Sequence, residues 1–260
     1  MTSHSAPLAA LRGLSDSLGH MRHLITQIFI TLFLALPLQA QPVTVFAAAS
    51  LREALNEIAM QYPDDVTLSF AGSGTLARQV AAGAPADAVV LAHRDWAMWL
   101  DARGLILPHT TQEVAGGQLV LIGAPDAVPI PNTDTATLMS ALNGGRLAMG
   151  QRDGVPAGTY AREWLQHIDA WDVLSSQLAE TDNVRAALAL VAQRAAPLGL
   201  VYASDAMAEP RVRILHSIAA DAHAPIRYPA AAITETGRDF LEHLSTPQAI
   251  AIFTKHGFAP

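Results

Sequence analysis

Cysteine is absent from the 260 residues, and charged residues make up only 15% of them. The absence of cysteine excludes disulfide bonds, thiolate metal sites and cysteine nucleophiles. Basic residues are also few, with 16 Lys and Arg against 23 Asp and Glu and a net charge of −7. Because no basic stripe is available for phosphate contacts, we expect no nucleic-acid partner. An anion site has to be local and built from hydrogen-bond donors, since the overall charge repels anions.

Motifs of common enzymes are missing as well. The sequence contains no Walker A lysine loop and no H-E-x-x-H zinc motif. The loop around Ser73 does not fit the G-x-S-x-G pattern of α/β-hydrolases, because Ala71 and Thr75 stand where that pattern has glycine. A secreted serine hydrolase with Ser50 or Ser73 as nucleophile stays a distant alternative. We expect a protein that is not an enzyme and needs no cofactor.

The first 40 residues have the pattern of a leader. Arg22 follows Met21, residues 24–38 are mostly apolar, and Ala40 ends the segment. A basic start, a short apolar run and a small residue at the cut are typical of a secretory signal peptide. The apolar run is shorter than the roughly 20 residues that a membrane span requires. We predict a start at Met21 and cleavage after Ala40, with an uncleaved signal anchor as the alternative.

Strand and helix patterns alternate along the rest of the chain. Runs rich in β-branched residues predict strands, and apolar residues at helical spacing predict helices. The predicted strands cover 43–49, 66–70, 88–91, 119–122, 146–149, 198–202 and 227–233, and the predicted helices cover 51–60, 75–82, 95–102, 135–142, 157–168, 183–194 and 237–253. This alternation favours the α/β class, with mostly parallel sheets covered by helices. Ligands of such sheets bind where strand ends lead into helix N-termini.

Three of these junctions combine small residues with a predicted helix start. They are Ala49-Ser50, the Gly-Ser-Gly-Thr loop at 72–75 and the Val-Pro-Ala-Gly-Thr-Tyr loop at 155–160. The first N–H groups of a helix lack internal partners and carry partial positive charge. Converging helix starts can therefore bind an oxyanion without Lys or Arg. Ser50 also fits the more ordinary role of an N-cap, with Glu53 completing a capping box.

Seven segments together resemble the periplasmic molybdate-binding proteins. They run in order along the mature chain, at 45–51, 70–79, 83–87, 143–148, 155–161, 197–206 and 253–258. The resemblance implies a type II periplasmic binding protein with two lobes, each a mixed, mostly parallel sheet flanked by helices. Lobe one would comprise 41–117 and 227–260, and lobe two 118–226. The resemblance also implies a monomer in the periplasm that serves the membrane permease of an ABC importer.

The resemblance further implies a binding site for molybdate, and for tungstate. That family holds the oxyanion with two serine hydroxyls, a tyrosine hydroxyl and backbone N–H groups. Matched motif by motif, the site residues are Ser50, Ser73, Ala157, Val184 and Tyr202. Molybdenum would be bound only as the oxyanion, through these same residues.

One departure from the family and several alternatives accompany this prediction. The serine loop often reads Ser-Ser-Ser in the family, whereas Gly72 and Gly74 flank Ser73 here, which we expect to alter loop stiffness and affinity. Tyr202 also fits the ordinary role of a tyrosine that satisfies a core hydrogen bond. Alternative functions are a carrier of another tetrahedral oxyanion, such as sulfate, and a signalling or adhesive protein that keeps the fold without transport.

Overall fold

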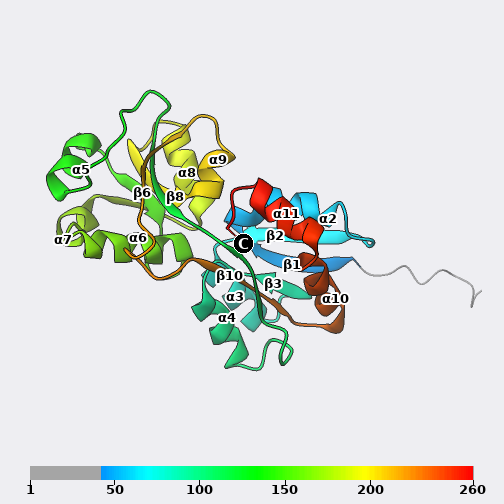
Figure 1. Ribbon diagram of the computed structural model, residues 1–260. Helices are drawn as coiled ribbons and strands as arrows, with labels where there is room; N and C mark the ends of the chain where they lie inside the picture. Colours follow the sequence, from blue (N-terminus) through cyan, green and yellow to red (C-terminus); the bar gives the residue numbers. More distant parts are fainter. Residues whose placement is uncertain (1–41, 260) are drawn as a thin grey trace, which may run out of the picture. The chain divides into compact units, whose positions relative to one another are not determined.

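The structure is a computed structural model that describes residues 42–259 (Figure 1). The predicted leader, with its start at Met21 and its cut after Ala40, lies outside the described residues. Within the described part, no helix combines the length and the apolar character needed to cross a membrane.

The first sheet contains strands from both ends of the described chain. Its order is β2-β1-β3-β10-β4, with β1 parallel to β2 and β3, and β10 antiparallel to β3 and β4. The strands are β1 (Val43–Ala48), β2 (Val66–Ala71), β3 (Ala88–Val90), β4 (Gln112–Gly116) and β10 (Arg227–Ala232). The helices around this sheet are α2 (Arg52–Ala59), α3 (Ser73–Ala81), α4 (Arg94–Asp101), α10 (Glu235–Leu244) and α11 (Pro247–Lys255).

The second sheet is built from the middle of the chain. Its order is β7-β6-β8-β5-β9, with β6 parallel to β7 and β8, and β5 antiparallel to β8 and β9. The strands are β5 (Leu119–Gly123), β6 (Leu147–Gly150), β7 (Leu178–Thr181), β8 (Leu198–Tyr202) and β9 (Arg213–Ser217). The helices around this sheet are α5 (Thr135–Leu142), α6 (Pro156–His167), α7 (Trp171–Leu174), α8 (Val184–Ala192) and α9 (Ala203–Met207).

The predicted architecture of two mixed sheets, each flanked by helices, is confirmed (Figure 1). Parallel pairings are fewer than expected, because β10 and β5 each run antiparallel to both of their neighbours. Three strands escaped the sequence patterns: β4, β7 and β9. All three lie at sheet edges and alternate little between apolar and polar residues, so their pattern is weak. The chain passes between the sheets at 116–119 and returns at 217–227.

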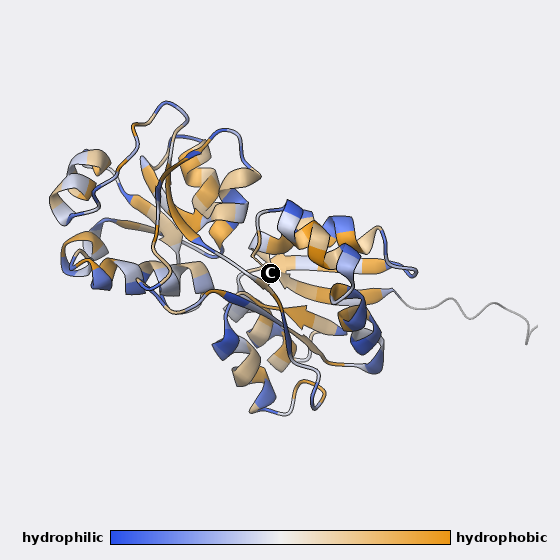
Figure 2. Cartoon of the chain, in the orientation of Figure 1, coloured by the Kyte–Doolittle hydropathy of each residue, from blue (hydrophilic) through white to orange (hydrophobic). Residues whose placement is uncertain are grey.

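Buried apolar strands form the centre of each sheet. In Figure 2 most central strands are hydrophobic, whereas the helices carry hydrophilic residues on one side. Residues 119–122 of β5 are all fully buried. On α2 the buried residues Ala54, Leu55 and Ile58 follow helical spacing, so the helix packs one apolar face on the sheet. Sheets packed in this way hold their strand ends, and the loops that follow them, in fixed places.

Candidate functional site

One small cavity collects all five predicted site residues. Its volume is about 10 Å³, which is close to the room that one water molecule requires. The five residues are each less than 5% exposed. The complete lining is Ala48, Ala49, Ser50, Ala71, Gly72, Ser73, Ala92, Val155, Pro156, Ala157, Asn183, Val184 and Tyr202.

The cavity lies where strand ends lead into helix starts. From the first sheet, β1 leads into a 3₁₀ turn (Ala49–Leu51) and β2 leads into α3. From the second sheet come the first residues of α6 and α8 and the end of β8. Ser73 and Val184 are the first residues of their helices, and Ala157 is the second of its helix. Their N–H groups lack partners within the helix, so the cavity is lined with amide donors.

Ser50 does not cap a helix, which corrects one sequence prediction. Helix α2 has Leu51 at its N-cap and no side-chain cap bond. Ser50 lies in the preceding 3₁₀ turn, and its hydroxyl is 3.2 Å from that of Tyr228. Glu53, the expected capping-box partner, instead forms an ion pair with Arg185. The extra turn carries the Ser50 side chain from the helix end to the cavity, so its hydroxyl is available to a ligand.

Ser73 holds its hydroxyl in a comparable way. It begins α3, and its Oγ accepts a hydrogen bond of 3.0 Å from the backbone N–H of Ala92. An amide can only donate, so this bond leaves the proton of the Ser73 hydroxyl unused. A ligand that only accepts hydrogen bonds fits that proton.

Tyr202 brings a third hydroxyl to the cavity from the end of β8. Its oxygen is buried and has no hydrogen-bond partner among residues 42–259. A buried polar group without a protein partner is costly, and a bound ligand is one way to satisfy it. Burial raises the pKa of Tyr202 well above its ordinary value of 10, so the group stays protonated and can donate.

Three charged side chains form a network beside the cavity. Arg185, which follows Val184, makes a two-pronged contact with Glu53 and an ion pair of 2.5 Å with Asp205. It also lies 3.4 Å from the carbonyl oxygen of Ser50. Asp205 is fully buried, and burial raises its pKa to about 6 although Arg185 acts in the opposite direction. None of these charged side chains is part of the cavity lining, so the donors there are neutral.

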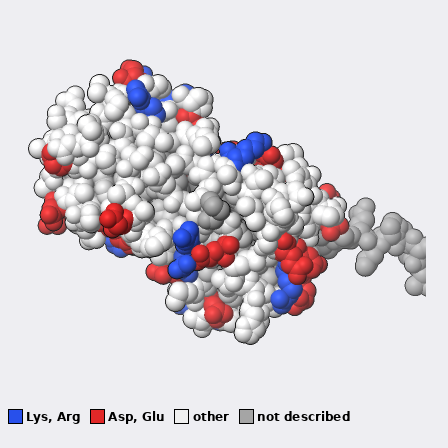
Figure 3. All heavy atoms as spheres, viewed as in Figure 1, with Lys and Arg blue, Asp and Glu red and all other residues white. Residues whose placement is uncertain are grey.

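Charge elsewhere on the visible face is mixed. In Figure 3 the blue Lys and Arg atoms mostly lie next to red Asp and Glu atoms, with broad neutral areas between them. This face therefore presents no basic field, as the composition predicts.

Gly72 and Gly74 lie where two parts of the chain approach closely. A Cβ atom on Gly72 would be 2.5 Å from the carbonyl oxygen of Asp182, and one on Gly74 would be 2.4 Å from that of Gly154. The N–H of Gly74 donates to the same Gly154 oxygen at 3.2 Å. The absence of side chains here lets the loops of the second sheet close over Ser73.

The serines lack the surroundings of a nucleophile. Activation of a serine requires a base within hydrogen-bond reach. The partner of Ser50 is a phenol and the partner of Ser73 is an amide, and neither is a base. Within 42–259 no three His, Asp or Glu side chains gather into a group that could hold a bare metal ion.

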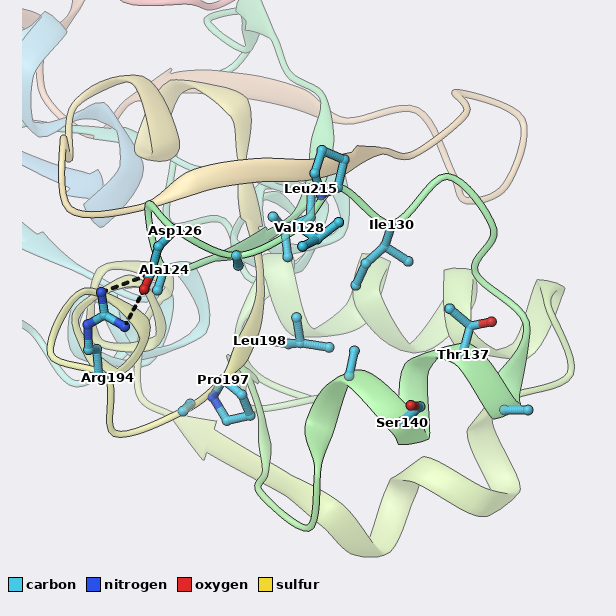
Figure 4. Close-up of a pocket in the computed structure, with 15 residues that line it drawn as sticks. Ala124, Asp126, Val128, Ile130, Thr137, Ser140, Arg194, Pro197, Leu198 and Leu215 are labelled. Atoms are coloured by element: carbon cyan, nitrogen blue, oxygen red, sulfur yellow. Dashed lines mark hydrogen bonds and ion pairs between the residues drawn. The ribbon is translucent and has the colours of Figure 1, made fainter.

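A much larger cavity lies elsewhere in the described chain and suits an anion poorly. It has a volume of about 910 Å³ between α5 and the loop that precedes it (Figure 4). Its one basic side chain, Arg194, is already paired with Asp126. The start of α5 is capped by the carboxylate of Asp134, which accepts the Thr137 N–H at 2.8 Å. The Asp134 carboxylate therefore already accepts from the start of α5, where an anionic ligand would otherwise bind.

Sequence reasoning missed two groups that hold the serines, Ala92 and Tyr228. Tyr228 was included only as part of a predicted strand. It is fully buried in β10, and Pro229 follows it at a register shift between β10 and β4. A proline in a central strand indicates a bulge, and bulges redirect side chains. The Tyr-Pro pair within a predicted strand was therefore the sequence signal that could have indicated a redirected Tyr228 side chain.

Comparison with known proteins identifies the family of this chain and supports its fold. Residues 43–259 match the family described as bacterial extracellular solute-binding protein. The molybdate-binding protein ModA of Escherichia coli is 44% identical over 226 residues, which cover 83% of this chain and 88% of the relative. ModA of Haemophilus influenzae is 38% identical, covering 84% and 89%. The structure of the periplasmic molybdate-binding protein of Azotobacter vinelandii shares the fold, with a TM-score of 0.74 at 24% identity over 84% of this chain and 99% of that one. The chain belongs to the bacterial extracellular solute-binding protein family, a family of binding proteins and not of enzymes.

Proposed function

We propose that this chain captures molybdate, and tungstate with it, in the cavity between the two sheets. Ser50, Ser73 and Tyr202 would donate from their hydroxyls, and Ala157 and Val184 from their backbone N–H groups. The observation that carries the proposal is the convergence of these five buried residues on one cavity without a carboxylate in its lining. The names of the two ModA relatives support molybdate as the oxyanion.

The donor set suits a fully ionised oxyanion. Molybdate carries no proton near neutral pH, so it only accepts hydrogen bonds. The cavity supplies donors, and the partnerless Tyr202 hydroxyl is one that a ligand would satisfy. Phosphate keeps a proton at this pH and would need an acceptor, which disfavours it. Discrimination against sulfate would depend on the size that the cavity takes when its lining opens around the anion, because the cavity as described is smaller than either anion and sulfate has the same charge and shape.

We further propose capture by closure of the two lobes. The anion would dock on the helix starts of one lobe, and the other lobe would complete its donors, a hinge motion. Lobe one would comprise 41–117 and 227–260, and lobe two 118–226. The protein would act as a monomer in the periplasm, after removal of the leader, and would deliver the anion to the permease of an ABC importer.

Molybdate is expected to raise the thermal unfolding midpoint of the purified protein. A ligand that binds only the folded state stabilises it by about 2.7 kcal/mol at a concentration 100 times the dissociation constant. Thermal unfolding with molybdate, tungstate, sulfate or phosphate measures this directly. A larger shift with sulfate than with molybdate would favour the sulfate carrier, and no shift with any oxyanion would contradict capture.

Ser50→Ala and Ser73→Ala are each expected to weaken molybdate binding by about 1.5–3 kcal/mol, because each removes a hydrogen bond to a charged ligand. Titration calorimetry measures the change. Ser204→Ala is the matched control, since Ser204 is also buried but lies outside the cavity lining. Unchanged affinity in both cavity variants would overturn the assignment of the site.

A further inference from the structure

Among residues 42–259, the hydroxyl of Tyr228 has a single hydrogen-bond partner, the hydroxyl of Ser50 at 3.2 Å. Tyr228 is fully buried, and its ring packs edge-on against Tyr202 and Phe258 at centroid distances of 5.9 and 5.2 Å. Burial raises its pKa well above 10, so the phenol keeps its proton. The Tyr228 phenol therefore has one proton to donate, and the Ser50 oxygen is the one acceptor within reach of it among residues 42–259.

The direction of this hydrogen bond follows from the surroundings of Tyr228. If Ser50 donated to Tyr228, the phenolic proton would be buried without an acceptor, which costs free energy. If Tyr228 donates to Ser50, both protons can be used, because that of Ser50 is then free for the cavity. Ser73 shows the same arrangement with an unambiguous donor, since the Ala92 amide donates to its Oγ.

We propose that Tyr228 is a positioning residue that donates to Ser50 and thereby directs the Ser50 proton into the cavity. The inference rests on the proposed capture of an oxyanion and deepens it. With the Ala92 amide acting likewise on Ser73, both serines become donors toward the ligand. Tyr228 therefore contributes to the preference for anions that carry no proton.

The bulge in β10 explains how the phenol reaches this place. The register between β10 and β4 shifts between Tyr228 and Pro229. On the other side of the strand, the carbonyl of Pro229 accepts the N–H of Leu91, so pairing continues next to β3. Tyr228 is held by the sheet and by two aromatic rings, and its hydroxyl is placed beside the 3₁₀ turn that carries Ser50.

A double-mutant cycle of Ser50→Ala and Tyr228→Phe tests this inference, with molybdate affinity measured by calorimetry. Tyr228→Phe alone is expected to weaken binding about tenfold. In the Ser50→Ala background the same change is expected to alter affinity less than about twofold, because the group through which Tyr228 acts is gone. A merely structural role would give equal effects in both backgrounds and would overturn the proposal.

Selectivity provides the second readout. Without the phenol, the Ser50 hydroxyl can turn and accept, so the preference for molybdate over hydrogen phosphate is expected to fall in Tyr228→Phe. The matched control is Ser204→Ala, which removes another buried hydroxyl, one that lies outside the cavity lining. This control should keep the selectivity of the original protein, and an equal fall in both variants would overturn the proposal.

A variant that preserves the phenol covers the case in which Tyr228→Phe does not fold. Site-specific 3-fluorotyrosine at position 228 keeps the ring and makes its hydroxyl a stronger donor. Molybdate binding is then expected to be at least as tight as before, and weaker binding would mean that the phenol accepts. If the unmodified protein binds no molybdate, the proposed function fails; if it binds and the cycle shows no coupling, only the role of Tyr228 fails.

Discussion

Replacing Arg185 by alanine is expected to lower the free energy of unfolding by about 3–5 kcal/mol, because it leaves a buried charge without its partner. Asp205 is fully buried, and Arg185 is its only ion-pair partner in 42–259. Asp205 also accepts the N–H of Tyr202 at 3.2 Å, so it cannot leave its place freely. Urea unfolding of the ligand-free protein measures the loss.

The loss is expected to depend on pH. The pKa of Asp205 in the folded protein is about 6, above its ordinary value of 3.8. An acid with a raised folded pKa contributes stability below the unfolded value, and this contribution is lost as the pH rises through the folded value. Removing Arg185 raises the folded pKa further, so the penalty should be largest at pH 7–8 and smaller near pH 4.

Glu53→Gln is the control for this experiment. Glu53 pairs with the same guanidinium but has a side chain that is 35% exposed, and partly exposed pairs contribute about 0–1 kcal/mol. We therefore expect a much smaller loss than for Arg185→Ala at pH 7–8. Equal losses for the two variants would show that the contact with Glu53, and not the burial of Asp205, governs the network.

The parts of the fold that local pattern determines were predictable. The strand-to-helix junctions before Ser50, Ser73 and Ala157 followed from small residues between apolar runs, and all three lie in one cavity. The edge strands β4, β7 and β9 were missed because an edge buries little, so its residues need not alternate. Val184 and Tyr202 came only from the family resemblance, since neither stands out as a donor by residue type and spacing.

Contacts between distant segments could not be read from the sequence. The bond between Ser50 and Tyr228 spans 178 residues, and the contact between Glu53 and Arg185 spans 132. Each contact depends on how the two sheets bring distant strands and loops together, and the spacing of apolar residues in the sequence carries no information about that. The predicted capping box at Ser50 is an example. The residues fit the local motif, but Glu53 pairs with Arg185 of α8, and the helix start has no side-chain cap.

Gly72→Ser is expected to weaken molybdate binding by about 1–3 kcal/mol, close to five- to 150-fold, because a side chain there obstructs closure. The backbone at Gly72 has φ −67° and ψ 139°, which any residue adopts, so the position does not need glycine for its conformation. Space is the constraint, since a Cβ atom would be 2.5 Å from the Asp182 oxygen and 3.3 Å from Val155. Both contacts come from loops of the second sheet.

The ligand-free protein should respond in the opposite direction. A serine at 72 has fewer conformations in the unfolded chain than glycine, which favours the folded state. When the lobes are apart, the added side chain meets no obstacle, so the thermal unfolding midpoint should stay the same or rise. Gly154→Ala is the matched control, because its Cβ would approach only the ends of the Gln151 and Arg78 side chains, at 3.2 and 3.9 Å. Calorimetry with molybdate should show a large loss for Gly72→Ser and a small one for Gly154→Ala. If Gly72→Ser binds as tightly as the original protein, the Asp182 loop moves aside without cost, and the absence of a side chain at Gly72 does not govern closure.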